Sequence, residues 1–332
     1  YKAGRVTLDD FVGVRKSRRW GESVGEVTLK DALGQAGKPK DWMPKPLPPV
    51  EPKPAPRSTL DNAARIRGEI DALHLKMGPP ADLEARYTLL LEQIQVLQGE
   101  NNKLYFASSD EDKRRRAEIE AALKPLRTEF VAVRGQIDKA LEARNAAARA
   151  LLYVDDPASF RVAFASKLDI KRRTAIERGL DEFRRLVSAD VLSTDKTLTV
   201  KAGGAGRSKY PWGSDTIVIA TAGRSTTTVH ELGHWLEEVN PGLHDKIMEF
   251  YDRRTAGEKL ITMNKALGGT GYRASEKTRP DKFVHPYMGK DYQRKGSEIL
   301  SMGLEMFYSD PHTLATKDPE YFDFIYNLVR GR

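Results

Sequence analysis

Apolar residues recur every three or four positions along residues 58–150, which is the spacing of one face of an α-helix. Three such runs are separated by Gly78-Pro79-Pro80 and by the polar segment 108–112. Their apolar members are Ile66, Ile70, Leu73 and Met77, then Leu83, Tyr87, Leu90, Ile94 and Leu97, then Ile119, Leu123, Leu126, Phe130, Val133 and Ile137. This heptad-like spacing predicts a long antiparallel helical hairpin, a coiled-coil arm through which the chain could self-associate. Pro125 falls inside the last run, where it should kink the helix.

The composition changes on both sides of this predicted arm. Residues 38–57 are rich in proline, which removes backbone donors and disfavours helix and sheet, so they predict a semi-rigid linker. From about Leu151 the pattern is that of a mixed globular domain. It predicts a helix near 171–187 and strands at 198–200 and 216–220. The fold class we expect is α+β and predominantly helical, divided into regions 1–37, 38–57, 58–150 and 151–332.

Composition excludes several classes of function. The 332 residues include no cysteine, which removes a disulfide scaffold, a thiolate metal site and a cysteine nucleophile. No apolar stretch approaches the ~18–20 residues of a membrane helix, so no membrane partner is expected. The net charge is +8, but the basic cluster at 15–19 lacks a binding motif, and we interpret it as a solvated face rather than a nucleic-acid site. Because the chain begins with Tyr1 rather than Met, we expect a fragment of a longer protein.

The strongest chemical signal is the pattern His-Glu-x-x-His at His230, Glu231 and His234. Ser225 and three threonines precede it and can cap a helix. On a helix the two histidines share one face and can bind one Zn²⁺, while the glutamate faces the open coordination position. There it could deprotonate a zinc-bound water, whose pKa falls toward ~7. The alternatives are two exposed histidines on an ordinary amphipathic helix, or a degenerate metal site without activity.

A catalytic zinc takes three protein ligands, so a third must be found. The extended motif with Gly at i+7 and His at i+10 is absent, because Glu237 and Asn240 stand there. In segment 296–307, Glu298 and Glu305 lie seven residues apart on one face of a largely apolar helix. A carboxylate in such surroundings needs a partner, and a metal supplies one. We assign Glu298 as the third ligand and Glu305 as a residue that holds an imidazole or the helix in place; a surface or salt-bridged acid is the alternative for Glu298.

A proline- and glycine-marked loop leads into this helix. Tyr292 is our candidate for stabilising the tetrahedral oxyanion, with Tyr287 and His285 as alternatives, and each has an ordinary packing role as the competing interpretation. The strand at 216–220 precedes the histidine helix and could be a sheet edge along which an extended peptide aligns. A core strand is the equal alternative.

Segments 228–237, 297–307 and 318–326 together resemble the metallopeptidase-like C-terminal domains of phage and prophage proteins. The opening residues 1–12 are similar to the tail of a Mu-type bacteriophage minor head, or head-morphogenesis, protein. This resemblance implies a zincin-like domain of the glutamate-zincin type over 151–332. It implies His230 and His234 as zinc ligands, Glu231 as the base and a downstream helix glutamate, here Glu298, as the third ligand.

The function implied is a phage-associated zinc metalloprotease, in the virion or the bacterial cytoplasm. Its polypeptide substrates would be phage structural proteins, including this chain itself, or a host protein, and its partners would be phage head or capsid proteins. Two alternatives stay open: a non-catalytic virion assembly protein with a structural metal site, and a delivered metalloprotease toxin.

Overall fold

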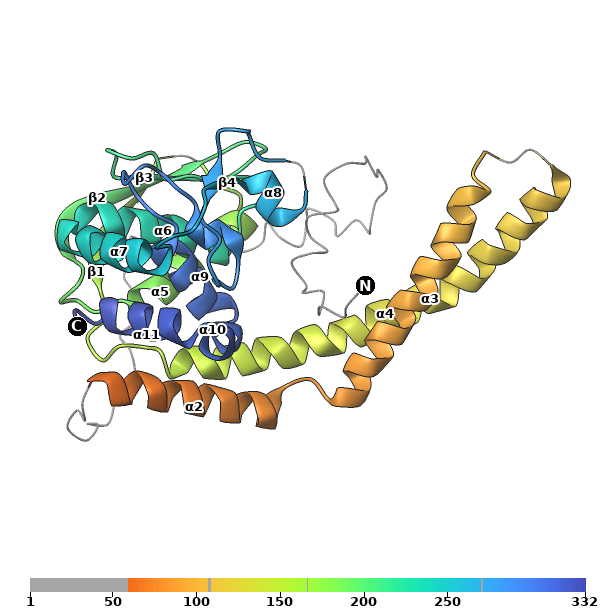
Figure 1. Cartoon of the computed structure of the whole chain (residues 1–332), viewed down its shortest axis with the longest axis horizontal. Coiled ribbons are helices and arrows are strands. Elements are labelled where there is room, and N and C mark those ends of the chain that lie inside the picture. Colours follow the sequence, from red (N-terminus) through yellow and green to blue (C-terminus); the bar gives the residue numbers. More distant parts are fainter. Residues whose placement is uncertain (1–58, 107–108, 166, 270) are drawn as a thin grey trace, which may run out of the picture. The chain divides into compact units, whose positions relative to one another are not determined.

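A computed structural model describes residues 59–332 apart from 107–108, 166 and 270 (Figure 1). The expected head-protein region, the proline-rich linker and the basic cluster therefore lie outside the described residues. The described part is α+β and mostly helical, which confirms the coarse fold class. None of its helices combines the length and the apolar character needed to cross a bilayer.

Three long helices open the described part: α2 (Thr59–Met77), α3 (Ala81–Lys103) and α4 (Asp110–Ala150). The apolar positions that recur at helical spacing join α3 to α4 in two clusters. One contains Leu90, Val133 and Ile137, and the other contains Ile94, Ile119 and Leu123. The hydroxyl of Ser109 accepts a hydrogen bond from the Asp112 N–H and caps α4, which then continues through Pro125 as one helix. Helix α2 runs alongside the later part of α4 (Figure 1).

A small parallel sheet forms one layer of the C-terminal part. Its strands β1 (Ser159–Phe164), β2 (Ser193–Ala202) and β3 (Thr216–Ile219) lie in the order β1-β2-β3. Helix α5 (Ile170–Leu186) makes the crossover from β1 to β2, close to the helix that the sequence predicts. Both predicted strands are present, and the first extends well beyond 198–200. A two-stranded antiparallel pair is formed by β4 (Ile261–Thr262) and β5 (Lys277–Thr278).

Seven further helical segments complete the part of the domain that the structure describes. They are α6 (Ser225–Val239), α7 (Pro241–Arg254), α8 (Met263–Leu267), the 3₁₀ turn η2 (Pro286–Gly289), α9 (Ile299–Ser309), α10 (Pro311–Lys317) and α11 (Pro319–Leu328). Helix α6 is central, because it packs against α5, α9 and β3. Its Val229, Leu232, Trp235 and Leu236 are fully buried in one continuous core.

Two glycines allow α6 to approach its neighbours closely. A Cβ added at Gly233 would lie 2.5 Å from the Cα of Ser301 on α9. A Cβ added at Gly179 on α5 would lie 2.6 Å from the Cβ of Thr228 on α6. Real side chains cannot occupy such distances, so any larger residue would push the helices apart. The start of α9 is consequently held directly against the middle of α6.

Candidate metal centre

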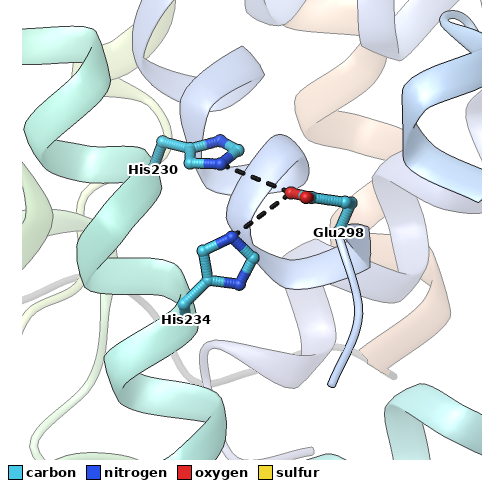
Figure 2. A group of neighbouring side chains, drawn as sticks. All are labelled: His230, His234 and Glu298. Carbon is cyan, nitrogen blue, oxygen red and sulfur yellow. Dashed lines mark ion pairs between the residues drawn. The ribbon is translucent and has the colours of Figure 1, made fainter. Parts of the chain in front are cut away.

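Helix α6 presents His230 and His234 on one face, one turn apart, as the i, i+4 spacing predicts. Their ring centroids are 4.9 Å apart and the rings are nearly perpendicular, at 83°. The Nε2 atom of each ring lies 3.3 Å from Oε2 of Glu298. Figure 2 shows the two imidazoles and the carboxylate pointing toward one another. Candidate ligand atoms of the three residues lie within 4.8 Å of one another, close enough to bind one metal ion.

His234 and Glu298 are buried and His230 is partly buried: 15% of the His230 side chain, 9% of His234 and 1% of Glu298 is exposed. Burial opposes the charged carboxylate, but His234 and His230 hold the pKa of Glu298 well below its usual value. Burial likewise opposes protonation of His230, but Glu298 and Glu305 raise its pKa well above the usual value. The directions of both shifts favour positive charge beside Glu298, which protons on the imidazoles or a metal ion can supply.

The outer nitrogen of His230 is held by Glu305, whose Oε2 lies 2.9 Å from Nδ1. A proton on Nδ1 directed at this carboxylate leaves the Nε2 lone pair free to bind a metal, the arrangement usual for metal-bound imidazoles. The corresponding Nδ1 of His234 is buried without a hydrogen-bond partner. Two imidazole nitrogens and one carboxylate oxygen make a donor set that suits zinc and related divalent metals.

Both oxygens of Glu298 receive hydrogen bonds, and these bonds fix the carboxylate. Oε2 accepts from the Ser301 hydroxyl at 2.9 Å. Oε1 accepts from the Tyr292 hydroxyl. Burial and the charge of Glu298 raise the pKa of Tyr292, so its hydroxyl keeps its proton and acts as a donor. In this structure Tyr292 therefore orients the proposed third ligand, and its role toward an oxyanion stays a prediction.

The two alternative candidates from the same loop lie differently. His285 accepts a hydrogen bond at Nδ1 from the Tyr287 N–H, 3.1 Å away, and does not belong to the metal-binding group. The Tyr287 hydroxyl accepts from Lys290 Nζ at 3.3 Å. That ammonium also lies over the rings of Tyr287 and Tyr292, 4.9 and 4.7 Å from their centroids. Lys290 thus packs against both phenols, one of which holds Glu298.

Glu231 is buried beside the group of three without being one of its members. Burial raises the pKa of its carboxyl, while His230 and His234 act in the opposite direction. The Tyr210 backbone acts in the same direction as the two histidines and lowers this pKa. A carboxyl with a raised pKa next to two imidazoles has the property that a general acid–base group needs.

The edge of β3 is not open at its centre. Val218 and Lys209 form an antiparallel bridge, with N–H to C=O distances of 2.9 and 3.0 Å. Ile217 and Ile219 are fully buried, as a core strand requires. The peptide edge considered from the sequence is therefore already paired at Val218.

Sequence reasoning missed two contacts of the metal-binding group. Ser301 binds Glu298, and Trp212 lies edge-on to His234 with a centroid distance of 5.8 Å. Gly296 admits the indole, because a Cβ there would lie 2.2 Å from the Trp212 ring. The contact of Trp212 with His234 joins segments distant in the chain, and no local pattern marks it. Ser301 follows Glu298 by only three residues, so that spacing could have indicated its hydroxyl as a partner. A cavity of about 490 Å³ lies next to this loop, and its lining includes Arg279, Tyr292 and Gly296.

Comparison of the chain with protein-family models, with curated proteins and with solved structures finds no match.

Proposed function

We propose that this chain is a zinc-dependent metallopeptidase with a zincin-like domain, in which His230, His234 and Glu298 hold the zinc and Glu231 is the general base. One observation carries the proposal. Two imidazole Nε2 atoms from one face of α6 converge on a single buried carboxylate oxygen from the start of α9. A second buried carboxyl, from the residue after the first histidine, lies beside them.

The number of protein ligands favours catalysis over a structural role. Structural zinc sites are closed by four protein ligands, whereas catalytic sites use three and keep one position open. The described residues contribute three ligands to this group. The rival proposal, a virion assembly protein with a structural metal, would need this site to stabilise the domain without hydrolysing any peptide.

The residues of the chain can be given roles in peptide hydrolysis. When bound, zinc would polarise the scissile carbonyl and lower the pKa of a water molecule. Glu231 can accept a proton from that water and deliver it to the leaving amine, and its raised pKa helps it to keep the proton between the two steps. Tyr292, Ser301 and Glu305 hold the ligands in orientation.

The resemblance to phage head proteins supports a choice of substrate and partner. The substrates we propose are phage structural chains, including the proline-rich residues 38–57 of this chain, or a host protein. The packed helices α3 and α4 would be an antiparallel arm for self-association or for binding to capsid protein. Val96 and Val131 are exposed on these helices and give such an arm apolar contact surface.

The proposal is tested with purified chain loaded with zinc, the Glu231→Gln variant and the His230→Ala variant. New N-termini in the chain and in a peptide library are measured by mass spectrometry, and zinc content by elemental analysis. Wild type should bind zinc and cleave, Glu231→Gln should bind zinc without cleaving, and His230→Ala should do neither. Cleavage by Glu231→Gln at the wild-type rate would remove Glu231 from the mechanism. Zinc that stabilises a chain unable to cleave any peptide would favour the structural role.

A further inference from the structure

Glu237, in the last turn of α6, is a buried acid that the proposed chemistry does not use. Its side chain is completely buried. A carboxylate removed from water is costly unless other groups bind it. Two side chains do so. Nδ1 of His244 on α7 lies 2.9 Å from Oε1, and the hydroxyl of Ser297 donates to Oε2 at 3.1 Å.

Ser297 connects Glu237 to Glu298, because Ser297 directly precedes Glu298 in the chain. The Ser297 hydroxyl donates to Glu237 and accepts from the N–H of Ile299, 3.2 Å away. Ser297 is itself buried, with 1% exposed. The backbone on both sides of Glu298 is therefore tied, through one hydroxyl, to the helix that carries the two histidines.

The segment that leads to Glu298 needs such an attachment. Gln293 and Arg294 have φ values of 55° and 62°, in the left-handed region that non-glycine residues rarely adopt. Glu298 itself, with φ −100° and ψ 2°, precedes the first residue of α9 and lies outside the regular helix. Side-chain contacts rather than a continuous helix must therefore set the position of its carboxylate.

We propose that Glu237 is a positioning residue for the metal centre: through Ser297 it fixes the start of α9 against α6, so that the Glu298 carboxylate faces His230 and His234. This inference rests on the proposed metal site. It adds a role for a residue three positions after His234, where the longer histidine motif would have glycine. Outer residues that hold metal ligands commonly change metal affinity by about 10- to 100-fold when they are removed.

A matched control exists in the same pair of helices. The Tyr308 hydroxyl, on α9, donates to the Ser225 hydroxyl, on α6, at 2.8 Å. Tyr308→Phe removes one hydrogen bond between α6 and α9 without touching the residues next to Glu298. A role of Glu237 in helix packing alone would make its loss resemble the loss of this bond.

The experiment measures zinc affinity of the full chain by competition with a chromophoric chelator, together with thermal stability. Ser297→Ala and Glu237→Ala should each weaken zinc binding roughly 10- to 100-fold. The double variant should lose no more zinc affinity than the single variant with the larger loss, because both residues act through one hydrogen bond. Glu237→Gln, which keeps an oxygen that can accept from Ser297, should recover most of the affinity. Tyr308→Phe should lower thermal stability and keep wild-type affinity.

Wild-type affinity in both alanine variants, or additive losses in the double variant, would overturn the positioning role while leaving the proposed function intact. Equal loss of affinity in Tyr308→Phe would also overturn it, in favour of general packing. If Glu237→Ala does not fold, Ser297→Ala decides, since it removes only one hydroxyl. A wild-type chain that binds no zinc would contradict this inference and the proposed function together.

Discussion

Two pairs of histidines lie close together in this molecule, and they differ in what faces them. His230 and His234 are nearly perpendicular, and both direct Nε2 at Glu298. His74 on α2 and His312 on α10 are stacked, with centroids 3.7 Å apart and an angle of 8°. Proximity of two imidazoles is common to both pairs and therefore does not by itself indicate a metal site.

The difference lies in the source of positive charge. Nη1 of Arg144, a buried arginine, lies 2.8 Å from Nδ1 of His74, and Asp310 balances its charge at 2.9 Å. Burial, His312 and Arg144 lower the pKa of His74. At the other pair, Glu298 and Glu305 overcome burial and raise the pKa of His230. The pair His74–His312 has Arg144 as its cation. The pair His230–His234 can take a cation from solution, as a proton or a metal ion.

The largest expected effect is on zinc content, when one histidine of each pair is replaced by alanine. His230→Ala should abolish stoichiometric zinc binding, because it removes one of three ligands. His74→Ala should bind one zinc per chain, as wild type does, because Arg144 already occupies the space beside that ring. Elemental analysis after dialysis against trace zinc measures both. Zinc retained by His230→Ala and lost by His74→Ala would reverse the assignment.

Chelation should have the next largest effect. A ligand that binds only the folded state at a hundredfold excess over its Kd stabilises by about 2.7 kcal/mol. EDTA should therefore lower the thermal midpoint of zinc-loaded wild type by a corresponding amount. The His230→Ala variant should show no change on chelation. An identical shift in both proteins would place the stabilising metal elsewhere.

A smaller effect is expected from the spacing of α6 and α9. The methyl group of a Gly233→Ala variant would lie only 2.5 Å from the Cα of Ser301. This clash should destabilise the fold by about 1–3 kcal/mol and weaken zinc binding. Gly99→Ala on α3 is the matched control, since no atom lies within 4 Å of its added Cβ. It should stabilise the chain by about 0.5–1 kcal/mol. Denaturant titration measures both stabilities. Unchanged zinc affinity in Gly233→Ala would show that zinc binding does not depend on the close packing of α6 against α9.

The smallest expected effect is a loss of stability at low pH that comes from His74 in the stacked pair. The folded-state pKa of His74 is lower than in the unfolded chain, so the unfolded chain binds the proton more readily. Stability from this group is present above about pH 6.5 and is lost as the pH falls through that value toward the lower folded pKa. Asp71 and Glu84 act against this shift, while His312 and Arg144 reinforce it. Wild type should lose more stability between pH 7 and 5 than His74→Gln does, and equal losses would contradict this.

Local patterns predicted the elements and the chemistry that depends on spacing. The histidine helix, the helix of Glu305, the α5 helix and the strand at 216–219 follow from periodicity within one segment. The contact of Glu298 with both histidines could be anticipated because a carboxylate in an apolar segment needs a partner.

Other features depend on side-chain contacts that the periodicity of a single segment does not predict. The approach of Gly233 to Ser301, the hydrogen bond from Tyr292 to Glu298 and the stack of His74 on His312 are set by packing in three dimensions. Tyr292 shows the consequence. Its position in the loop indicated a group near the metal, but its hydrogen-bond partner could not be predicted from its place in the chain.

The most direct test of the metal centre is an anomalous difference map collected at the zinc edge from crystals of the zinc-loaded chain. The account predicts one peak enclosed by Nε2 of His230, Nε2 of His234 and the Glu298 carboxylate, about 2.0–2.2 Å from each ligand atom. Glu231 should lie beside the peak without binding it. A peak at other side chains, or these three residues paired with one another and no peak between them at saturating zinc, would contradict the account.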